Sequence, residues 1–189
     1  MKRILSVLLV FLLVFSLTSC SLGKKKLAAD PQPAEESPQN TAAAEEPVAD
    51  NAKVFSCEEL RITLTDDFDP VAGITSYTGV FNSDDEIVFI LREDKGYFDE
   101  ISLDDYAEMV VEVNENAGHI IEKLHKKDGI PVFEYEYTNP DSNVTYAYHT
   151  TVFESDDAFW LVQFTCYADE YKDHVEAFHK YARSVMFDE

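Results

Sequence analysis

The sequence has 189 residues, of which 37 are acidic and 15 are basic, so its formal net charge at pH 7 is −22. Hydrophobic residues make up 46 % of the chain, which is enough for a folded core and excludes disorder over the whole length. So acidic a chain cannot neutralise phosphates and is not expected to bind nucleic acid. Three cysteines are too few for a disulfide-stapled miniprotein or a multi-cysteine zinc module.

The N-terminus has the pattern of an export signal. Lys2-Arg3 is followed by an apolar run from Ile4 to Leu17, which is short for a membrane span of about 20 residues. The sequence Leu17-Thr18-Ser19-Cys20 then resembles the lipobox of bacterial lipoproteins. The resemblance implies that residues 1–19 are removed as a signal peptide and that the sulfur of Cys20 carries lipid. The protein would then be anchored in the cell membrane, facing the extracytoplasmic side. An uncleaved N-terminal anchor helix is the alternative.

Residues 20–52 differ in composition from residues 53–189, which form the expected globular domain. Four of the seven prolines lie in the first of these segments and no aromatic residue does, so it cannot bury enough surface to fold. We expect a disordered tether, in which the Lys24–Lys26 triplet either rests on anionic headgroups or is simply solvated. The domain has 31 acidic and 10 basic residues, so its formal charge of −21 should repel an anionic membrane and attract cations.

Hydrophobic periodicity predicts seven strands and two helices in the domain. One helix is expected from the N-cap Ser102 to a stop at Gly118, and a second from about Asp169 to Val185. The expected strands are residues 60–64, 75–81, 87–92, 119–125, 131–138, 144–153 and 159–166. The short turns between them favour antiparallel pairing. The predicted class is therefore α+β, with a mainly antiparallel sheet of about six to seven strands and two principal helices.

Several segments of the domain resemble the PsbP-like superfamily. They are Leu60–Phe68, Tyr77–Phe81, Ser102–Tyr106, Gly129–Tyr135 and Phe159–Phe164, together with the closing helix. This superfamily includes an extrinsic subunit of photosystem II, a Ran-binding relative and many bacterial lipoproteins. The resemblance covers most of residues 55–187 and rests on hydrophobic patterns. It implies an α/β/α sandwich and a binding or accessory role, and it brings no shared catalytic residues.

The sequence offers no catalytic or cofactor-binding motif. There is no nucleophile elbow, phosphate loop or dinucleotide motif. None of the histidines has metal-ligand spacing, so we expect separate surface residues at His119, His125, His149, His174 and His179. No metal and no cofactor are therefore expected, although an uncharacterised hydrolase is one alternative.

Two short segments of the domain are similar to each other. Val80–Asp85 resembles Val152–Asp157, and each leads into an apolar strand, which indicates repeated hairpin-turn chemistry. The alternative is a Ca²⁺-responsive module in which these loops donate carboxylates, together with Asp66, Asp67 and Asp69.

Two cysteines lie in the domain, and their state is open. Outside the cytoplasm Cys57 and Cys166 could form a disulfide, which would close a loop of more than a hundred residues. They could equally be two separate thiols.

Tyrosines provide the candidate binding surface. If Pro140–Asn143 is a four-residue loop, Tyr137 faces Tyr146 and Tyr135 faces Tyr148 on one side of the sheet. These four residues are either core beneath a helix or an aromatic platform for a glycan, a peptide or a protein partner. The sequence as a whole predicts a membrane-anchored, non-enzymatic binding or accessory lipoprotein.

Overall fold

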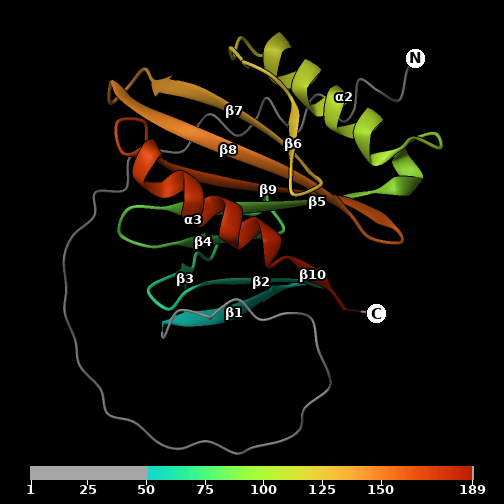
Figure 1. Cartoon of the computed structure of the whole chain (residues 1–189), viewed down its shortest axis with the longest axis horizontal. Helices are drawn as coiled ribbons and strands as arrows, with labels where there is room; N and C mark the ends of the chain where they lie inside the picture. Colours follow the sequence, from blue (N-terminus) through green and yellow to red (C-terminus); the bar gives the residue numbers. More distant parts are fainter. Residues whose placement is uncertain (1–50, 189) are drawn as a thin grey trace, which may run out of the picture. The chain divides into compact units, whose positions relative to one another are not determined.

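The computed structural model describes residues 51–188 (Figure 1). The leader, Cys20 and nearly all of the expected tether lie outside the described residues. Within residues 51–188, no helix is both long and apolar enough to cross a bilayer. The first strand begins at Ala52, one residue before the predicted start of the domain.

The described residues form two antiparallel sheets and two α-helices, which confirms the predicted α+β class. The small sheet has the order β1 (Ala52–Cys57), β2 (Leu60–Thr65), β10 (Met186–Phe187). The large sheet has the order β3 (Asp69–Pro70), β4 (Gly79–Asn82), β5 (Ile87–Asp94), β9 (Ala158–Tyr167), β8 (Val144–Glu154), β7 (Ile130–Asn139), β6 (His125–Lys127). The helices are α2 (Leu103–Asn116) and α3 (Tyr171–Arg183), with a 3₁₀ turn η1 (Lys95–Tyr97).

The two helices cover opposite faces of the large sheet. Tyr106 of α2 stacks on Phe159, with ring centroids 4.2 Å apart, and Phe178 of α3 stacks on Phe164 at 5.3 Å. Phe159 and Phe164 lie five residues apart on β9, so their side chains point to opposite sides of the strand. We call these sides the α2 face and the α3 face.

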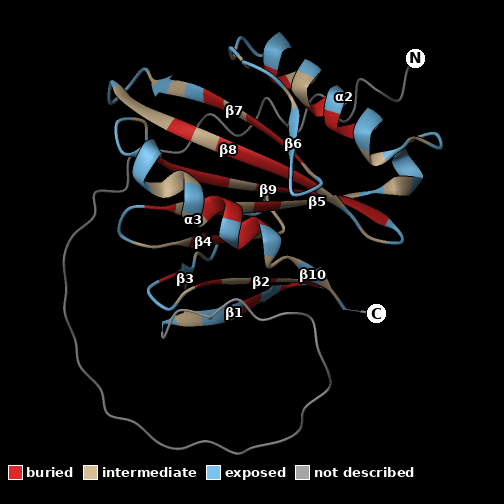
Figure 2. Cartoon of the chain, in the orientation of Figure 1, coloured by how far each residue is buried: buried red, intermediate tan, exposed pale blue. Residues whose placement is uncertain are grey.

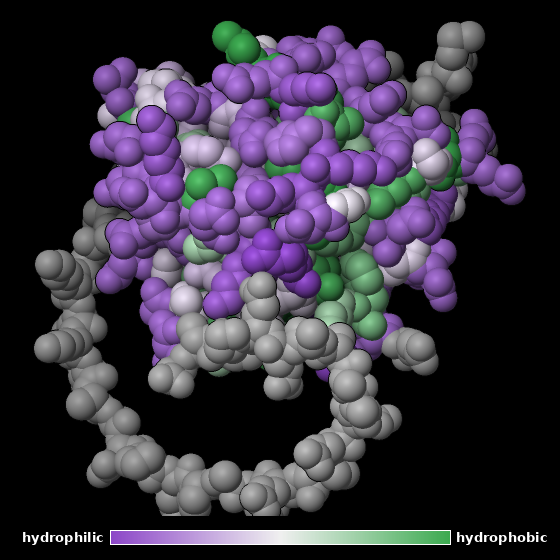
Figure 3. All heavy atoms as spheres, viewed as in Figure 1, coloured by the Kyte–Doolittle hydropathy of each residue, from purple (hydrophilic) through white to green (hydrophobic). Residues whose placement is uncertain are grey.

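The main core lies on the α3 face. There the small sheet and α3 pack against the large sheet, and buried residues follow the inner sides of β8, β9 and α3 (Figure 2). Ser184, directly after α3, fixes the helix to the small sheet: its Oγ accepts a hydrogen bond from the Thr63 backbone N–H at 2.8 Å and donates to the Tyr181 carbonyl of the helix at 2.6 Å. Hydrophilic residues cover most of the outer surface on this side (Figure 3).

Helix α2 begins as its sequence predicts. The Ser102 side chain accepts a hydrogen bond from the Asp105 backbone N–H, and the Asp105 carboxylate accepts one from the Ser102 backbone N–H. This reciprocal capping satisfies two backbone donors that the first helical turn leaves free. Gly118, with a φ of +95°, follows the end of the helix, as the sequence indicated.

The prediction of a strand over residues 119–125 is wrong. The chain is irregular there, and β6 pairs with β7 only over His125–Lys127. His119 instead lies against the rings of Tyr135 and Tyr137, so its segment crosses the sheet face and does not extend the edge. A tight turn at Asp128-Gly129 joins β6 to β7, and both residues have positive φ, as a two-residue hairpin requires.

Candidate functional site

Tyrosines form two adjacent rows on the α2 face of the large sheet. The β7–β8 loop has the predicted four residues, so Tyr135 pairs with Tyr148 and Tyr137 pairs with Tyr146. Strand β9 extends both rows, because Tyr146 also pairs with Tyr167 and Tyr148 with Thr165.

A sixth tyrosine joins these rows from the connection before β4. The Tyr77 ring packs on Phe89 of β5, with centroids 4.8 Å apart, and Phe89 pairs with Gln163, which donates a hydrogen bond to the Tyr135 hydroxyl. We define the tyrosine surface as Tyr77, Tyr135, Tyr137, Tyr146, Tyr148 and Tyr167. It gathers six of the ten tyrosines of the chain.

The rings of the tyrosine surface are held by stacking. Tyr135 and Tyr148 are nearly parallel, with centroids 4.8 Å apart and an interplanar angle of 5°. Tyr146 and Tyr167 stack at 5.6 Å, and His119 lies over Tyr135 at 4.5 Å. Such contacts restrict the rings in advance, so little side-chain entropy would be lost when a ligand binds.

The tyrosine surface is only partly covered by α2, which packs on β7 and β8. Beneath the helix Phe133 is fully buried, and Tyr135 is 9 % exposed. Tyr137, Tyr146 and Tyr148 are half-buried, and Tyr167 is 40 % exposed. The sequence left open whether the four tyrosines are core residues or an accessible platform, and each interpretation holds for some of them. Tyr135 belongs to the core, and the other three predicted tyrosines retain accessible surface.

Polar groups lie among the rings. Gln163 Nε2 donates hydrogen bonds to the Tyr135 hydroxyl at 3.0 Å and to Thr150 Oγ1 at 2.9 Å. Burial raises the pKa of Tyr77 to about 12 and raises the pKa values of Tyr135 and Tyr148 as well. These phenols are therefore neutral at pH 7, when they can stack and can donate or accept hydrogen bonds, but they do not act as bases.

Four of the histidines are not separate surface residues, contrary to the prediction, and one of them is His119, which packs on Tyr135. His149 is fully buried; its Nδ1 lies 2.9 Å from the Tyr171 hydroxyl and 3.4 Å from a carboxylate oxygen of Glu134. The His179 ring meets the His149 ring edge to face, with centroids 4.8 Å apart. His174 is paired with Glu86. The sequence offered no signal for this, because the β4–β5 turn, β7, β8 and α3 contribute these residues from distant positions.

His149, His179, Tyr171 and Glu134 form what we call the histidine cluster, which connects α3 to the large sheet. Burial alone would raise the pKa of Glu134, but the hydrogen bond to His149 and the charges of His149, His125 and His179 hold it below its usual value. Over residues 51–188, no three His, Cys, Asp or Glu side chains are arranged to hold a metal ion.

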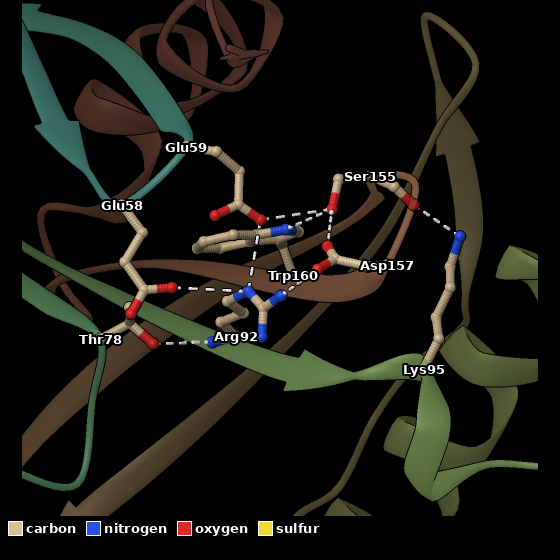
Figure 4. Close-up of polar contacts among 8 residues, drawn as sticks. All are labelled: Glu58, Glu59, Thr78, Arg92, Lys95, Ser155, Asp157 and Trp160. Atoms are coloured by element: carbon tan, nitrogen blue, oxygen red, sulfur yellow. Dashed lines mark hydrogen bonds and ion pairs between the residues drawn. The ribbon is translucent and has the colours of Figure 1, made fainter. Parts of the chain in front are cut away.

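A second polar cluster surrounds Arg92 of β5 (Figure 4). The guanidinium lies 3.4 Å from Glu58, 3.3 Å from Glu59 and 2.8 Å from Asp157, and it lies over the Trp160 ring. Glu58 and Glu59 form the β1–β2 turn, and Asp157 lies in the β8–β9 turn. The cluster therefore ties the small sheet to the large one, and its role is structural.

Cys57 and Cys166 are both buried free thiols, so the structure does not contain the disulfide that the sequence left open. Cys57 lies against Gly79, which pairs with Ile90, and Ile90 pairs with Val162. Cys166 is four residues further along β9, a distance of about 13 Å. A disulfide requires Cα atoms within about 7 Å of each other.

The two similar segments are both hairpin turns, as expected. Residues 83–86 join β4 to β5, and residues 155–157 join β8 to β9. Because Asp94 at the far end of β5 pairs with Ala158, the two turns lie at opposite ends of the sheet. The carboxylates of the two turns therefore do not converge on one site.

Sequence reasoning missed Tyr77 and Tyr167. The signal for Tyr167 was available, because a short β8–β9 turn places it opposite Tyr146 in the same way that the β7–β8 loop paired the other tyrosines. Tyr77 carries no such signal, since the connection before β4 has no regular pairing that fixes its side.

Comparisons with known proteins identify the fold. No protein-family model matches the sequence, and no curated protein is significantly similar to it. Among solved structures, cyanobacterial PsbP (CyanoP) from Synechocystis is similar, with a TM-score of 0.52 and 10 % identity over 78 % of this chain and 98 % of that one. This similarity confirms the PsbP-like fold and, at such low identity, shows the fold alone.

Two further structures are more distantly similar. A Bacteroides thetaiotaomicron protein has a TM-score of 0.49 and 12 % identity, over 74 % of this chain and 49 % of that one. LpqN of Mycobacterium tuberculosis, described as involved in cell envelope biogenesis, has a TM-score of 0.42 and 12 % identity, over 69 % of this chain and 83 % of that one.

Proposed function

We propose that this protein is a lipid-anchored extracytoplasmic binding protein and that the tyrosine surface holds its partner. One observation carries the proposal: six tyrosines from four separate segments gather on one sheet face, and part of that surface stays accessible. Aromatic rings that are fixed by stacking and carry neutral hydroxyls are typical of recognition surfaces.

The anchoring part of the proposal rests on the leader and the lipobox-like sequence that ends at Cys20. Acyl chains on this cysteine would hold the chain at the membrane, and the proline-rich segment before Ala52 would give the domain reach. The PsbP-like fold is compatible with an accessory role, but the binding role is argued from the tyrosine surface itself.

Site-specific photo-crosslinking in intact cells tests the binding role. We would place a benzophenone amino acid at Tyr146, and separately at Tyr97, which is 75 % exposed and lies on η1 at the other end of β5. A discrete crosslinked product from position 146 and none from position 97 is the expected result, because a specific partner covers one surface only. Equal products from both positions, or none from position 146, would contradict the proposal.

A further inference from the structure

Carboxylates surround the end of the large sheet that carries the accessible tyrosines. The β4–β5 turn, the β7–β8 turn and the β9–α3 connection all lie at this end, on the left of Figure 1. They supply five exposed acidic residues, which we call the acidic rim: Asp84, Asp85, Asp141, Asp169 and Glu170. None of the five is ion-paired within residues 51–188.

Several acidic residues elsewhere in the domain are paired with cations, unlike those of the acidic rim. Arg92 lies among three carboxylates, Lys126 is paired with Asp104, and Arg183 is paired with Asp128. The nearest basic residue in sequence to the rim is Lys172, in the first turn of α3. The rim therefore keeps a net negative charge beside the tyrosine rings.

The ring face of a tyrosine attracts a cation, and nearby carboxylates strengthen that attraction. A guanidinium group matches this surface best, since it stacks on aromatic rings and donates paired hydrogen bonds to carboxylates. Thr165, in the same row as Tyr148, is 2 % exposed, and its Oγ1 has no hydrogen-bond partner in the described part of the chain. The α2 face therefore contains a hydroxyl oxygen for which the described residues supply no hydrogen-bond partner.

We infer that the tyrosine surface and the acidic rim bind an arginine-bearing segment of a partner protein, an inference that rests on the proposed binding role. Charge complementarity selects this occupant. An anionic ligand would be repelled by the rim, and a neutral ligand would leave the negative charge of its five unpaired carboxylates uncompensated.

Peptide titration of the full chain, purified in a non-ionic detergent, tests this inference. Calorimetry would compare three capped peptides of four repeats each: Arg-Gly, Lys-Gly and citrulline-Gly, in about 150 mM salt. Citrulline keeps the shape and most hydrogen bonds of arginine but carries no charge. We expect the arginine peptide to bind most tightly, the lysine peptide more weakly and the citrulline peptide roughly tenfold more weakly or not at all.

Matched variants separate this site from the general negative charge of the domain. The rim variant Asp84→Asn/Asp85→Asn/Asp169→Asn should weaken arginine-peptide binding roughly tenfold. The control Asp99→Asn/Glu100→Gln/Asp156→Asn removes the same charge from exposed positions at the opposite end and should change binding less than about twofold.

Ring variants separate stacking from the hydroxyl groups. Tyr146→Ala/Tyr167→Ala should weaken binding roughly tenfold, and Tyr146→Phe/Tyr167→Phe, which keeps the rings, should leave it nearly unchanged. The Phe pair retains the stacked rings, so it should fold even if the Ala pair does not. The affinity of the Phe pair for the arginine peptide then shows whether the two hydroxyl groups contribute to binding.

Three results would overturn the inference: equal weakening by the two charge variants, equal binding of the citrulline peptide, or strong loss of binding in the Phe pair. If Tyr146 crosslinks a partner in cells but the arginine peptide does not bind, the occupant is wrong and the binding role stands. If neither occurs, both proposals fail.

Discussion

Gly79 allows the two sheets to approach each other at β1 and β4. A Cβ atom at this position would lie 2.6 Å from Cys57 Sγ and 3.3 Å from Cys57 Cβ. The first distance is far inside van der Waals contact, so a larger residue at position 79 would push the thiol out of the core. The glycine and the cysteine therefore depend on one another, although they lie in different sheets.

Gly79→Ala should lower the free energy of unfolding by about 1–3 kcal/mol, because it overpacks this contact. Cys57→Ala removes the clashing sulfur and should recover part of that loss when the two changes are combined. Urea unfolding of the single and double variants measures the coupling energy. Strict additivity of the two changes would show that the thiol does not fill this space.

His179 makes stability depend on pH. Burial lowers its pKa, the charges of His149 and Lys127 lower it further, and Glu176 and Glu134 oppose the shift. The unfolded chain therefore takes up the proton first, at a pH near 6.5, while the folded protein keeps the ring neutral. This contribution to stability is present above pH 6.5 and is lost as the pH falls below it.

The wild-type protein should accordingly lose stability between pH 7.5 and pH 5.5 relative to His179→Gln, which has no titrating ring. Each unit by which the pKa is lowered corresponds to about 1.4 kcal/mol. Guanidinium unfolding of both proteins at each pH gives the difference, in which the contributions of shared groups such as Glu86 cancel. Parallel pH profiles for the two proteins would be inconsistent with a lowered pKa at His179.

At the scale of elements, one arginine connects three of them. Arg92 of β5 contacts the β1–β2 turn through Glu58 and Glu59 and the β8–β9 turn through Asp157. Its side chain is only 20 % exposed, whereas Asp157 is 70 % exposed. The surroundings are therefore partly solvated, and the network should contribute moderately to stability.

Arg92→Ala should cost roughly 2 kcal/mol of unfolding free energy, because it leaves three carboxylates together and uncovers the Trp160 ring. Arg183→Ala is the matched control, since its pair with Asp128 is 40 % and 47 % exposed and should cost less than about 1 kcal/mol. Thermal unfolding followed by tryptophan fluorescence compares the two. Similar losses in both variants would remove the special role of Arg92.

The elements that depend on local signals were predictable. The capping box of α2, the four-residue β7–β8 loop and the alternating strands around it follow from neighbouring residues, and they placed four of the six surface tyrosines correctly. The small sheet was not predictable, since its third strand, Met186–Phe187, is two residues long and pairs with β2 from the far end of the chain. The same non-local pairing hid the histidine cluster and the acidic rim.

At the scale of the whole molecule, the acidic domain and the lipid anchor proposed at Cys20 complement one another. A domain with a formal charge of −21 is repelled by anionic headgroups, so a tether would hold it near the membrane without allowing it to lie flat. The tyrosine surface would then be available to partners in the envelope.

Cys20→Ser should abolish incorporation of an alkyne-tagged fatty acid and release the protein from the membrane fraction, because no acylated sulfur would remain. Cys57→Ser is the control and should keep both the label and the membrane association. Click labelling of cell fractions provides the measurement. If the Cys20→Ser protein still incorporated the fatty acid, the lipid would be attached to a residue other than Cys20.

Covalent footprinting of tyrosines, in intact cells and on the purified full chain, tests the binding surface most directly. Mass spectrometry would follow Tyr146 and Tyr167 against Tyr97, whose 75 % exposed ring lies away from the tyrosine surface. Protection of Tyr146 and Tyr167 in cells, with Tyr97 modified equally in both samples, is the result that a bound partner predicts. If each of the three tyrosines were modified to the same extent in cells and in the purified sample, nothing would occupy the surface.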